Sequence, residues 1–237
     1  LDTIRKLVEA FGPSGYEEQT RQIILEEIEG LADEITVDAM GNVIAWKRCG
    51  KKDPVKVMLS SHMDEIGIMV SHVDERGFLR FTSIGGLNPH TLLGNYVRFA
   101  DGTIGTIGVE QKDFSSAKAP DMAKMFIDIS GAEGTVKVGD VGGFYRQMIT
   151  RGDRLVCKTM DDRIACAIQI EIMRQLKKPA VDVAFVFSTQ EEVGLRGAET
   201  AAYAVNPDIG IALDVTRTGD TPEDVVMEVL RESVVRD

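Results

Sequence analysis

The sequence predicts an α/β domain interrupted by a small all-β insertion. Helical periodicity alternates with short apolar strands near the N-terminus, and the same alternation resumes near residue 160. Between residues 67 and 156, glycine is frequent, helical periodicity is scarce and turn dipeptides separate short β-type runs. The insertion therefore divides one α/β domain into two stretches of sequence.

The N-terminal stretch predicts two helices. Residues 3–11 form the first, and Gly12-Pro13 ends it. Ser14 and Glu17 have the spacing of a capping box, which would start the second helix. The apolar stripe of this second helix comprises Ile23, Ile24, Ile28 and Leu31. Strands are expected after it around residues 35–37, 43–46 and 55–59.

The remaining elements follow from turn signals and periodicity. Inside the insertion, Asp101-Gly102 between two β-type runs predicts a hairpin. His72 and His90 lie in the insertion and are interpreted as surface or turn residues. The helix that opens at Asp161 has a predicted apolar stripe of Ile164, Ile168, Ile172 and Leu176. A strand at 183–190, a helix at 196–204, a strand at 209–213 and an amphipathic helix after Pro222 complete the prediction.

Acidic residues and one histidine gather where these strands end and where one helix begins. The residues are His62, Asp161, Glu191, Glu192 and Asp214. Paired acids at a strand end are ordinarily the first solvated residues of a loop. In open α/β sheets, however, ligands collect at the carboxyl ends of the strands. An imidazole with several carboxylates suits zinc, cobalt or manganese, so the pattern favours a metal site.

The adjacent pair Glu191-Glu192 indicates a division of labour. Neighbouring side chains at a strand end point in different directions. One glutamate would therefore bind metal while the other acts as a base toward a water. Two divalent ions bridged by a carboxylate can lower the pKa of a water toward neutrality. The chemistry indicated is metal-assisted hydrolysis, most naturally of an amide.

A glycosidase is the rival enzyme class, because it also uses two carboxylates. Those carboxylates must flank the sugar at roughly 5–9.5 Å, which two neighbours at a strand end do not readily do. The glycosidase interpretation also leaves His62, Asp161 and Asp214 without a role.

Composition restricts the partners and the compartment. The 237 residues suffice for one large domain or two small ones. The net charge of −11 argues against a nucleic-acid partner. No apolar stretch approaches the roughly 20 residues that span a bilayer, and charges in the first residues argue against a secretory leader. Three cysteines do not suggest a disulfide scaffold, so a reducing cytoplasm is expected, with Cys166 as a small core residue.

Four ordered motifs resemble a known family, the tetrahedral di-metal aminopeptidases. This family includes glutamyl and deblocking aminopeptidases, and some members were once labelled endoglucanase M. The motifs are Ser61-His62-Met63-Asp64-Glu65-Ile66-Gly67, Met160-Asp161-Asp162-Arg163, Gln190-Glu191-Glu192-Val193-Gly194-Leu195-Arg196-Gly197-Ala198 and Ala212-Leu213-Asp214-Val215-Thr216. Residues 10–15 are similar to the same family, and the resemblance extends from residue 1 to about residue 222.

The resemblance implies a fold and an assembly. Residues 1–66 and 157–237 would form a three-layer α/β metallopeptidase domain, and residues 67–156 a barrel-like insertion that shapes subunit contacts. The subunits would assemble from dimers into tetrahedral dodecamers with inward-facing active sites. The substrates would be short peptides, hydrolysed at their N-termini.

The resemblance also implies a role for each site residue and two divalent ions, zinc or cobalt. His62 and Asp214 would bind one ion, Glu192 the other, and Asp161 would bridge them. Glu191 matches the general base. A further residue, Asp64, matches the acid that orients the ligand histidine.

The chain departs from the family pattern after Asp214. The family places a second metal-ligand histidine there, whereas the three histidines of this chain are His62, His72 and His90. The C-terminal portion of the hydrolase domain is therefore interpreted as incomplete. An inactive, oligomerising or regulatory subunit is the alternative, because Asp161 and Glu192 alone would hold a second ion poorly.

Overall fold

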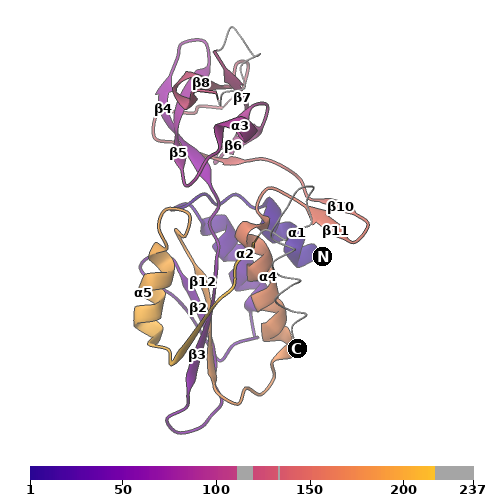
Figure 1. Ribbon diagram of the computed structural model, residues 1–237, viewed down its shortest axis with the longest axis vertical. Coiled ribbons are helices and arrows are strands. Elements are labelled where there is room, and N and C mark those ends of the chain that lie inside the picture. Colours follow the sequence, from indigo (N-terminus) through magenta and orange to yellow (C-terminus); the bar gives the residue numbers. More distant parts are fainter. Residues whose placement is uncertain (111–119, 133, 217–237) are drawn as a thin grey trace, which may run out of the picture.

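The computed structural model describes residues 1–110, 120–132 and 134–216. It has two parts, a sheet with helices and a closed barrel, which lie at opposite ends of the long axis (Figure 1). The helices are α1 Asp2–Glu9, α2 Glu18–Ile28, α3 Pro89–Leu92, α4 Met160–Gln175 and α5 Arg196–Val205, with a 3₁₀ turn at Met122–Lys124. The mixed α/β class with a β insertion is confirmed.

A five-stranded mixed sheet forms the centre of the first part. Its strand order is β1-β2-β12-β3-β13, in which β12 pairs in parallel with β3, and β3 with β13, while β1 and β2 are antiparallel. Its strands are β1 Glu34–Val37, β2 Val43–Lys47, β3 Lys56–His62, β12 Asp182–Ser188 and β13 Ile209–Ala212. Because β3, β12 and β13 run the same way, their carboxyl ends meet at one edge.

Alternate residues of the central strands are buried on opposite faces of this sheet. One face packs against α1, α2 and α4 through a cluster that includes Leu7, Ile24, Val43, Ala45, Ile170, Phe185 and Phe187. The other packs against α5 through Ile44, Trp46, Met58, Ala184, Val186, Ala201 and Val205. Figure 1 shows α5 on one side of the sheet and α4 on the other. The continuous burial of β12 reflects this covering on both faces.

The insertion contains a closed six-stranded barrel of order β4-β5-β8-β7-β6-β9. Its strands are β4 Gly67–Val73, β5 Phe78–Ile84, β6 Tyr96–Phe99, β7 Ile104–Val109, β8 Met125–Asp128 and β9 Val141–Phe144. The predicted hairpin at Asp101-Gly102 joins β6 to β7, and Gly102 has φ +90° there. Outside the barrel, β10 Ile149–Arg151 and β11 Arg154–Val156 form a separate two-stranded hairpin.

Two local predictions were wrong. Ser14 and Glu17 do not form a capping box, because the Ser14 hydroxyl donates to Asp64 and Glu17 accepts N–H groups of the loops around it. The helix begins at Glu18 without a side-chain cap. A capping box is a local pattern, and here both side chains form hydrogen bonds with other parts of the chain instead.

The predicted stripe of α4 was wrong in part, although Ile172 and Leu176 do pack against the core. Ile168 is 47% exposed, whereas the inward face carries Cys166 and Ile170 together with the buried polar residues Arg163 and Gln169. Hydrogen bonds satisfy the guanidinium of Arg163 and the amide N–H₂ of Gln169, so this face is not a purely apolar stripe. Cys166 is fully buried in the core, as expected.

The remaining expectations concern two histidines, the three cysteines and the C-terminal helix. His72 and His90 are exposed, and the three cysteines are free. The amphipathic helix predicted after Pro222 lies outside the described residues. Among the residues that are described, no helix is long and apolar enough to span a membrane.

Candidate metal centre

The candidate site lies at the edge where the parallel strands end. His62 is the last residue of β3, Glu191 and Glu192 lie in the turn after β12, and Asp214 follows β13. Asp161 is at the start of α4, where its backbone is non-helical (φ −78°, ψ 109°). The common direction of three strands therefore brings together His62 and Asp214, which are 152 positions apart in the sequence.

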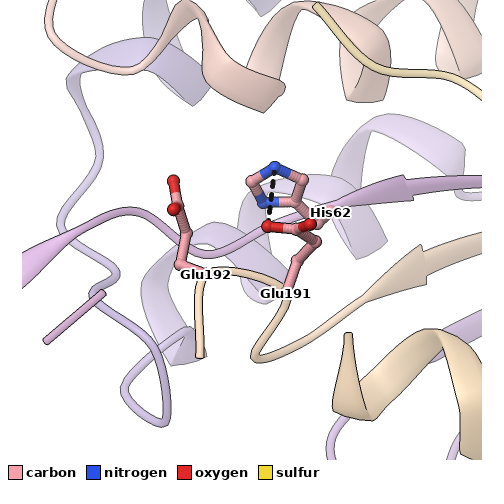
Figure 2. A group of neighbouring side chains, drawn as sticks. All are labelled: His62, Glu191 and Glu192. Atoms are coloured by element: carbon pink, nitrogen blue, oxygen red, sulfur yellow. Dashed lines mark ion pairs between the residues drawn. The ribbon is translucent and has the colours of Figure 1, made fainter. Parts of the chain in front are cut away.

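His62 is at the centre of this group. Its Nε2 lies 3.0 Å from Asp161 Oδ1 and 3.8 Å from Glu191 Oε2. Figure 2 shows Glu191 turned toward the imidazole, with Glu192 extending along a separate direction. The divergence of the two glutamates agrees with the expectation that neighbours at a strand end face different partners.

Ligand atoms in two groups lie close enough to share a cation. One group comprises His62, Asp161 and Asp214, and the other His62, Glu191 and Glu192; within each group the atoms lie within 4.8 Å of one another. His62 is buried, Asp161 and Asp214 are exposed, and the glutamates are intermediate. The site is thus open to solvent on the side of the two aspartates.

Asp64 lies behind the histidine and is fully buried. Its Oδ1 is 3.2 Å from His62 Nδ1, within ion-pair distance, although Nδ1 does not meet hydrogen-bond geometry. The same carboxylate accepts the backbone N–H groups of Glu191 at 3.0 Å and Glu192 at 3.1 Å. Asp64 thus lies at ion-pair distance from the histidine, and it also contacts the glutamate turn, a contact that the sequence did not indicate.

The sequence analysis missed Asp162 as a member of the site. Asp162 is fully buried, and its Oδ2 accepts the backbone N–H of His62 at 3.2 Å. Among the described residues, no group donates a hydrogen bond to its Oδ1. The Asp161-Asp162 pair in the motif was the available signal, but a motif match does not tell which of two neighbours faces inward.

A buried group of charged side chains, Lys158, Glu65 and Arg163, lies next to the site. Lys158 Nζ pairs with Glu65 Oε2 at 2.5 Å and donates to Ala10 O. The Arg163 guanidinium lies 3.7 Å from Glu65 Oε1 and donates to Met63 O. Burial lowers the pKa of Lys158 to about 8 despite the Glu65 carboxylate. These bonds connect the loop after α1, the end of β3 and the start of α4. The sequence did not predict them, because the residues that form them are far apart along the chain.

Several acidic side chains surround the single imidazole of His62, and the pKa values of some of them and of the imidazole are shifted. Burial would lower the pKa of His62, but Asp161 and Asp64 outweigh it and raise the pKa to about 11. Burial and the neighbouring Asp161 raise the pKa of Glu192 to about 7. Burial, with the nearby acids adding to it, also raises the pKa of Asp162 to about 7. Such shifts mark a place where negative charge lacks sufficient compensation.

These residues fit a divalent cation. Burial and, after it, repulsion from neighbouring acids raise the pKa of Glu192 and Asp162, and a cation would stabilise the charged form of both carboxylates. Two ligand atoms about 2.0–2.2 Å from one tetrahedral zinc ion lie roughly 3.3–3.6 Å apart, close to the 3.0 Å between His62 Nε2 and Asp161 Oδ1. Imidazole and carboxylate are also the ligand types that zinc accepts.

Comparison with known proteins agrees with this fold. An aminopeptidase from Desulfurococcus kamchatkensis has a similar structure, with a TM-score of 0.87 and 36% identity over 96% of this chain and 66% of its own. The TET1 peptidase of Pyrococcus horikoshii, which can assemble into a tetrahedron or a large octahedral shell, has a TM-score of 0.80 and 30% identity over 93% of this chain and 72% of its own.

Sequence comparison gives the family. A putative aminopeptidase of Acetivibrio thermocellus is 44% identical over 234 residues, which are 97% of this chain and 70% of the relative. Fold, site and relatives together define a peptide hydrolase. The chain belongs to the M42 glutamyl aminopeptidase family, whose sequence pattern matches residues 41–230. It spans about two thirds of the length of the relatives it matches.

Proposed function

We propose that the full-length protein is a metal-dependent aminopeptidase that removes N-terminal residues from short peptides. The family match supports a peptidase rather than a glycosidase. The observation that carries the proposal is the convergence of His62, Asp161 and Asp214 in one group, with Glu191 beside the same imidazole. The catalytic part would be a three-layer α/β domain of residues 1–66 and 157–237, with residues 67–156 as the insertion.

The proposed roles are those that the family resemblance implies, and they use residues of both groups. His62 and Asp214 would hold one ion, Glu192 would hold the second, and Asp161 would contribute to both. Asp161 suits the bridging role because its Oδ1 is 3.0 Å from the histidine and its side chain is exposed toward solvent. Asp64 suits the orienting role because it is buried beside the other ring nitrogen of His62.

Glu191 is proposed as the general base. When bound, divalent zinc or cobalt supplies Lewis-acid chemistry, lowering the pKa of water toward neutrality and polarising a carbonyl. Glu191 takes the proton of the attacking water and delivers it to the leaving amine. Partial burial raises the pKa of Glu191, which favours proton acceptance near neutral pH. Its backbone N–H, held by Asp64, fixes where the carboxylate stands.

Assembly and compartment are further parts of the proposal. Self-association into a dimer and then a tetrahedral dodecamer is supported by the assembly of the similar TET1 peptidase. An enclosed assembly would admit short unfolded peptides and exclude folded proteins. A cytoplasmic location is consistent with three free cysteines, and the net charge of −11 disfavours nucleic acid as a partner.

A second candidate, an inactive or structural subunit, rests on one observation. In the proposed roles, Asp161 and Glu192 are the protein ligands of the second ion. Zinc sites usually have at least three protein ligands. Metal counting separates the candidates: two ions per chain support the enzyme, whereas one or none supports the inactive subunit.

Hydrolysis by the full-length protein tests the proposal. After chelation, zinc or cobalt is restored and release of the N-terminal residue is followed on free, N-acetylated and progressively longer peptides. We expect activity only on free N-termini, with rates that fall as peptides lengthen. Absence of aminoacyl hydrolysis with every divalent metal, or equal rates on acetylated peptides, would reject the assignment. Cleavage of a β-glucan instead would restore the glycosidase interpretation.

A further inference from the structure

The turn that carries Glu191 and Glu192 is held by side chains from outside it. Gln190, the first residue of this turn, has φ +54°, a left-handed conformation that residues with a side chain seldom adopt. Leu195, at the far end, also has positive φ, +59°. A turn of this shape keeps its geometry only where surrounding groups fix it.

Two carboxylates receive three consecutive backbone N–H groups of this turn. Glu17 Oε1 accepts the N–H of Gln190 at 3.1 Å, and Asp64 accepts those of Glu191 and Glu192. Glu17 is only 3% exposed and Asp64 is fully buried. Hydrogen bonds from backbone N–H groups to buried carboxylates are charge-assisted and strong. The direction in which each glutamate leaves the backbone is therefore set by these two acids.

Ser14 binds the same oxygen of Asp64 that accepts the N–H of Glu192. Its hydroxyl donates to Asp64 Oδ2 at 2.6 Å, and both residues are buried. The loop that carries Ser14 and Glu17 is itself fixed to the end of β3. Ser14 N donates to Glu65 O, Glu65 N donates to Gly12 O, and Pro13 forms a parallel bridge with Glu65. One short loop between α1 and α2 thus supplies Glu17 and contacts Asp64, the two carboxylates that bind the backbone of the glutamate turn.

We propose that Ser14 and Glu17 are positioning residues, which set the placement of Glu191 and Glu192 relative to His62. Ser14 acts through Asp64, and Glu17 acts directly on the backbone of Gln190. The inference rests on the proposed function for the roles of the two glutamates. It assigns a function to two residues whose local pattern resembles an ordinary helix start, and it identifies no new ligand.

The test uses the full-length protein with kcat, KM, zinc dissociation by chelator competition, and thermal unfolding as readouts. Because a misplacement of ~1 Å can cost about 10²-fold in rate, Ser14→Ala and Glu17→Met should lower kcat by about 10–100-fold with KM within about twofold. Glu17→Met should also weaken zinc binding, because Glu192 lies in this turn and would move with it. Glu17→Gln keeps an acceptor oxygen and should recover most of both losses.

A matched control separates positioning from stability. Thr103 is buried in the turn between β6 and β7, and its hydroxyl donates to the Asp101 carboxylate at 2.9 Å. Thr103→Val therefore removes a similar bond away from the site, and it should lower thermal stability while leaving kcat and zinc binding unchanged. A double-mutant cycle adds a second criterion: in a Glu191→Gln background, the kcat loss from Ser14→Ala should largely disappear.

The outcomes are distinguishable. Unchanged kcat and zinc binding in both Ser14→Ala and Glu17→Met would overturn the inference, as would equal losses in Thr103→Val. A full Ser14→Ala loss in the Glu191→Gln background would overturn the route from Ser14 to the base. If the wild-type protein hydrolyses no aminoacyl substrate, the proposed function fails. Zinc dissociation from Glu17→Met and Glu17→Gln then still decides whether Glu17 positions Glu192.

Discussion

The Nε2 of His62 lies 3.0 Å from the Oδ1 of Asp161, although the two residues are 99 positions apart in the sequence. The histidine ends β3, and the aspartate opens α4 after the whole barrel insertion. The packing of α4 on the sheet therefore brings the two side chains together, although the barrel insertion separates them in the sequence. Two ligand types suited to one cation meet there.

Replacing the proposed base should affect turnover more than metal binding. Glu191→Gln keeps the shape of the side chain but cannot accept the proton from water. We expect kcat to fall by roughly 10²–10⁴-fold, the usual contribution of general acid–base catalysis, while metal content stays at the wild-type value. Steady-state kinetics and elemental analysis of the same preparation provide the measurement. Loss of metal with little change in kcat per bound metal would indicate that Glu191 is a ligand.

Replacing the neighbouring glutamate should have the opposite effect. Glu192→Gln removes the carboxylate of a proposed metal ligand, whose pKa burial and then the neighbouring Asp161 raise to about 7. We expect weaker metal binding, and activity that returns in part at high metal concentration. Titration with zinc, followed by activity and by calorimetry, tests this. A wild-type zinc affinity together with a large loss of kcat would mean that the roles of the adjacent pair are reversed.

The metal-free protein should lose stability as the pH rises. The pKa values of Glu192 and Asp162 are raised from 4.5 and 3.8 to about 7, so the folded state binds more protons than the unfolded state between these values. Stability is therefore greatest below pH ~4 for these groups and is lost through pH ~7. His62, raised from 6.5 to about 11, continues the loss above pH 6.5.

Urea unfolding after chelation measures this dependence. The unfolding midpoint should be lower at pH 8 than at pH 5, and zinc at pH 8 should raise it because the cation replaces the protons. Asp162→Asn should reduce the slope. A midpoint that rises with pH in the chelated protein would show that the crowded acids are not what limits its stability.

One of the three thiols should be inert in the folded protein. Burial raises the pKa of Cys166 to about 12, so roughly one molecule in 10⁴ carries its thiolate at pH 8. Cys49 and Cys157 are only half-buried. Ellman's reagent should titrate at most two thiols in the native state and three in urea. In Cys166→Ala the native count should stay the same and the denatured count should fall to two. Rapid labelling of a third native thiol would contradict the burial of Cys166.

Much of the fold was predictable because its signals are local. The alternation that buries Phe185 and Phe187 on one face and Ala184 and Val186 on the other is written in the strand itself. Asp-Gly at 101–102 predicted its hairpin for a comparable reason, since the turn conformation depends on those two residues. The ends of β3, β12 and β13 likewise indicated where His62, Glu191 and Asp214 would converge.

The sequence by itself determined the classes of element, the edge at which the ligands gather and the family to which the chain belongs. The tertiary structure alone decided which polar groups support that edge. Ser14 and Glu17 have the spacing of a helix cap, yet they hold Asp64 and the N–H of Gln190. Asp162, indistinguishable from Asp161 by pattern, is the one that holds the backbone of His62. Periodicity and caps depend on neighbours a few residues away, whereas a buried carboxylate takes whichever donors the packed chain brings to it.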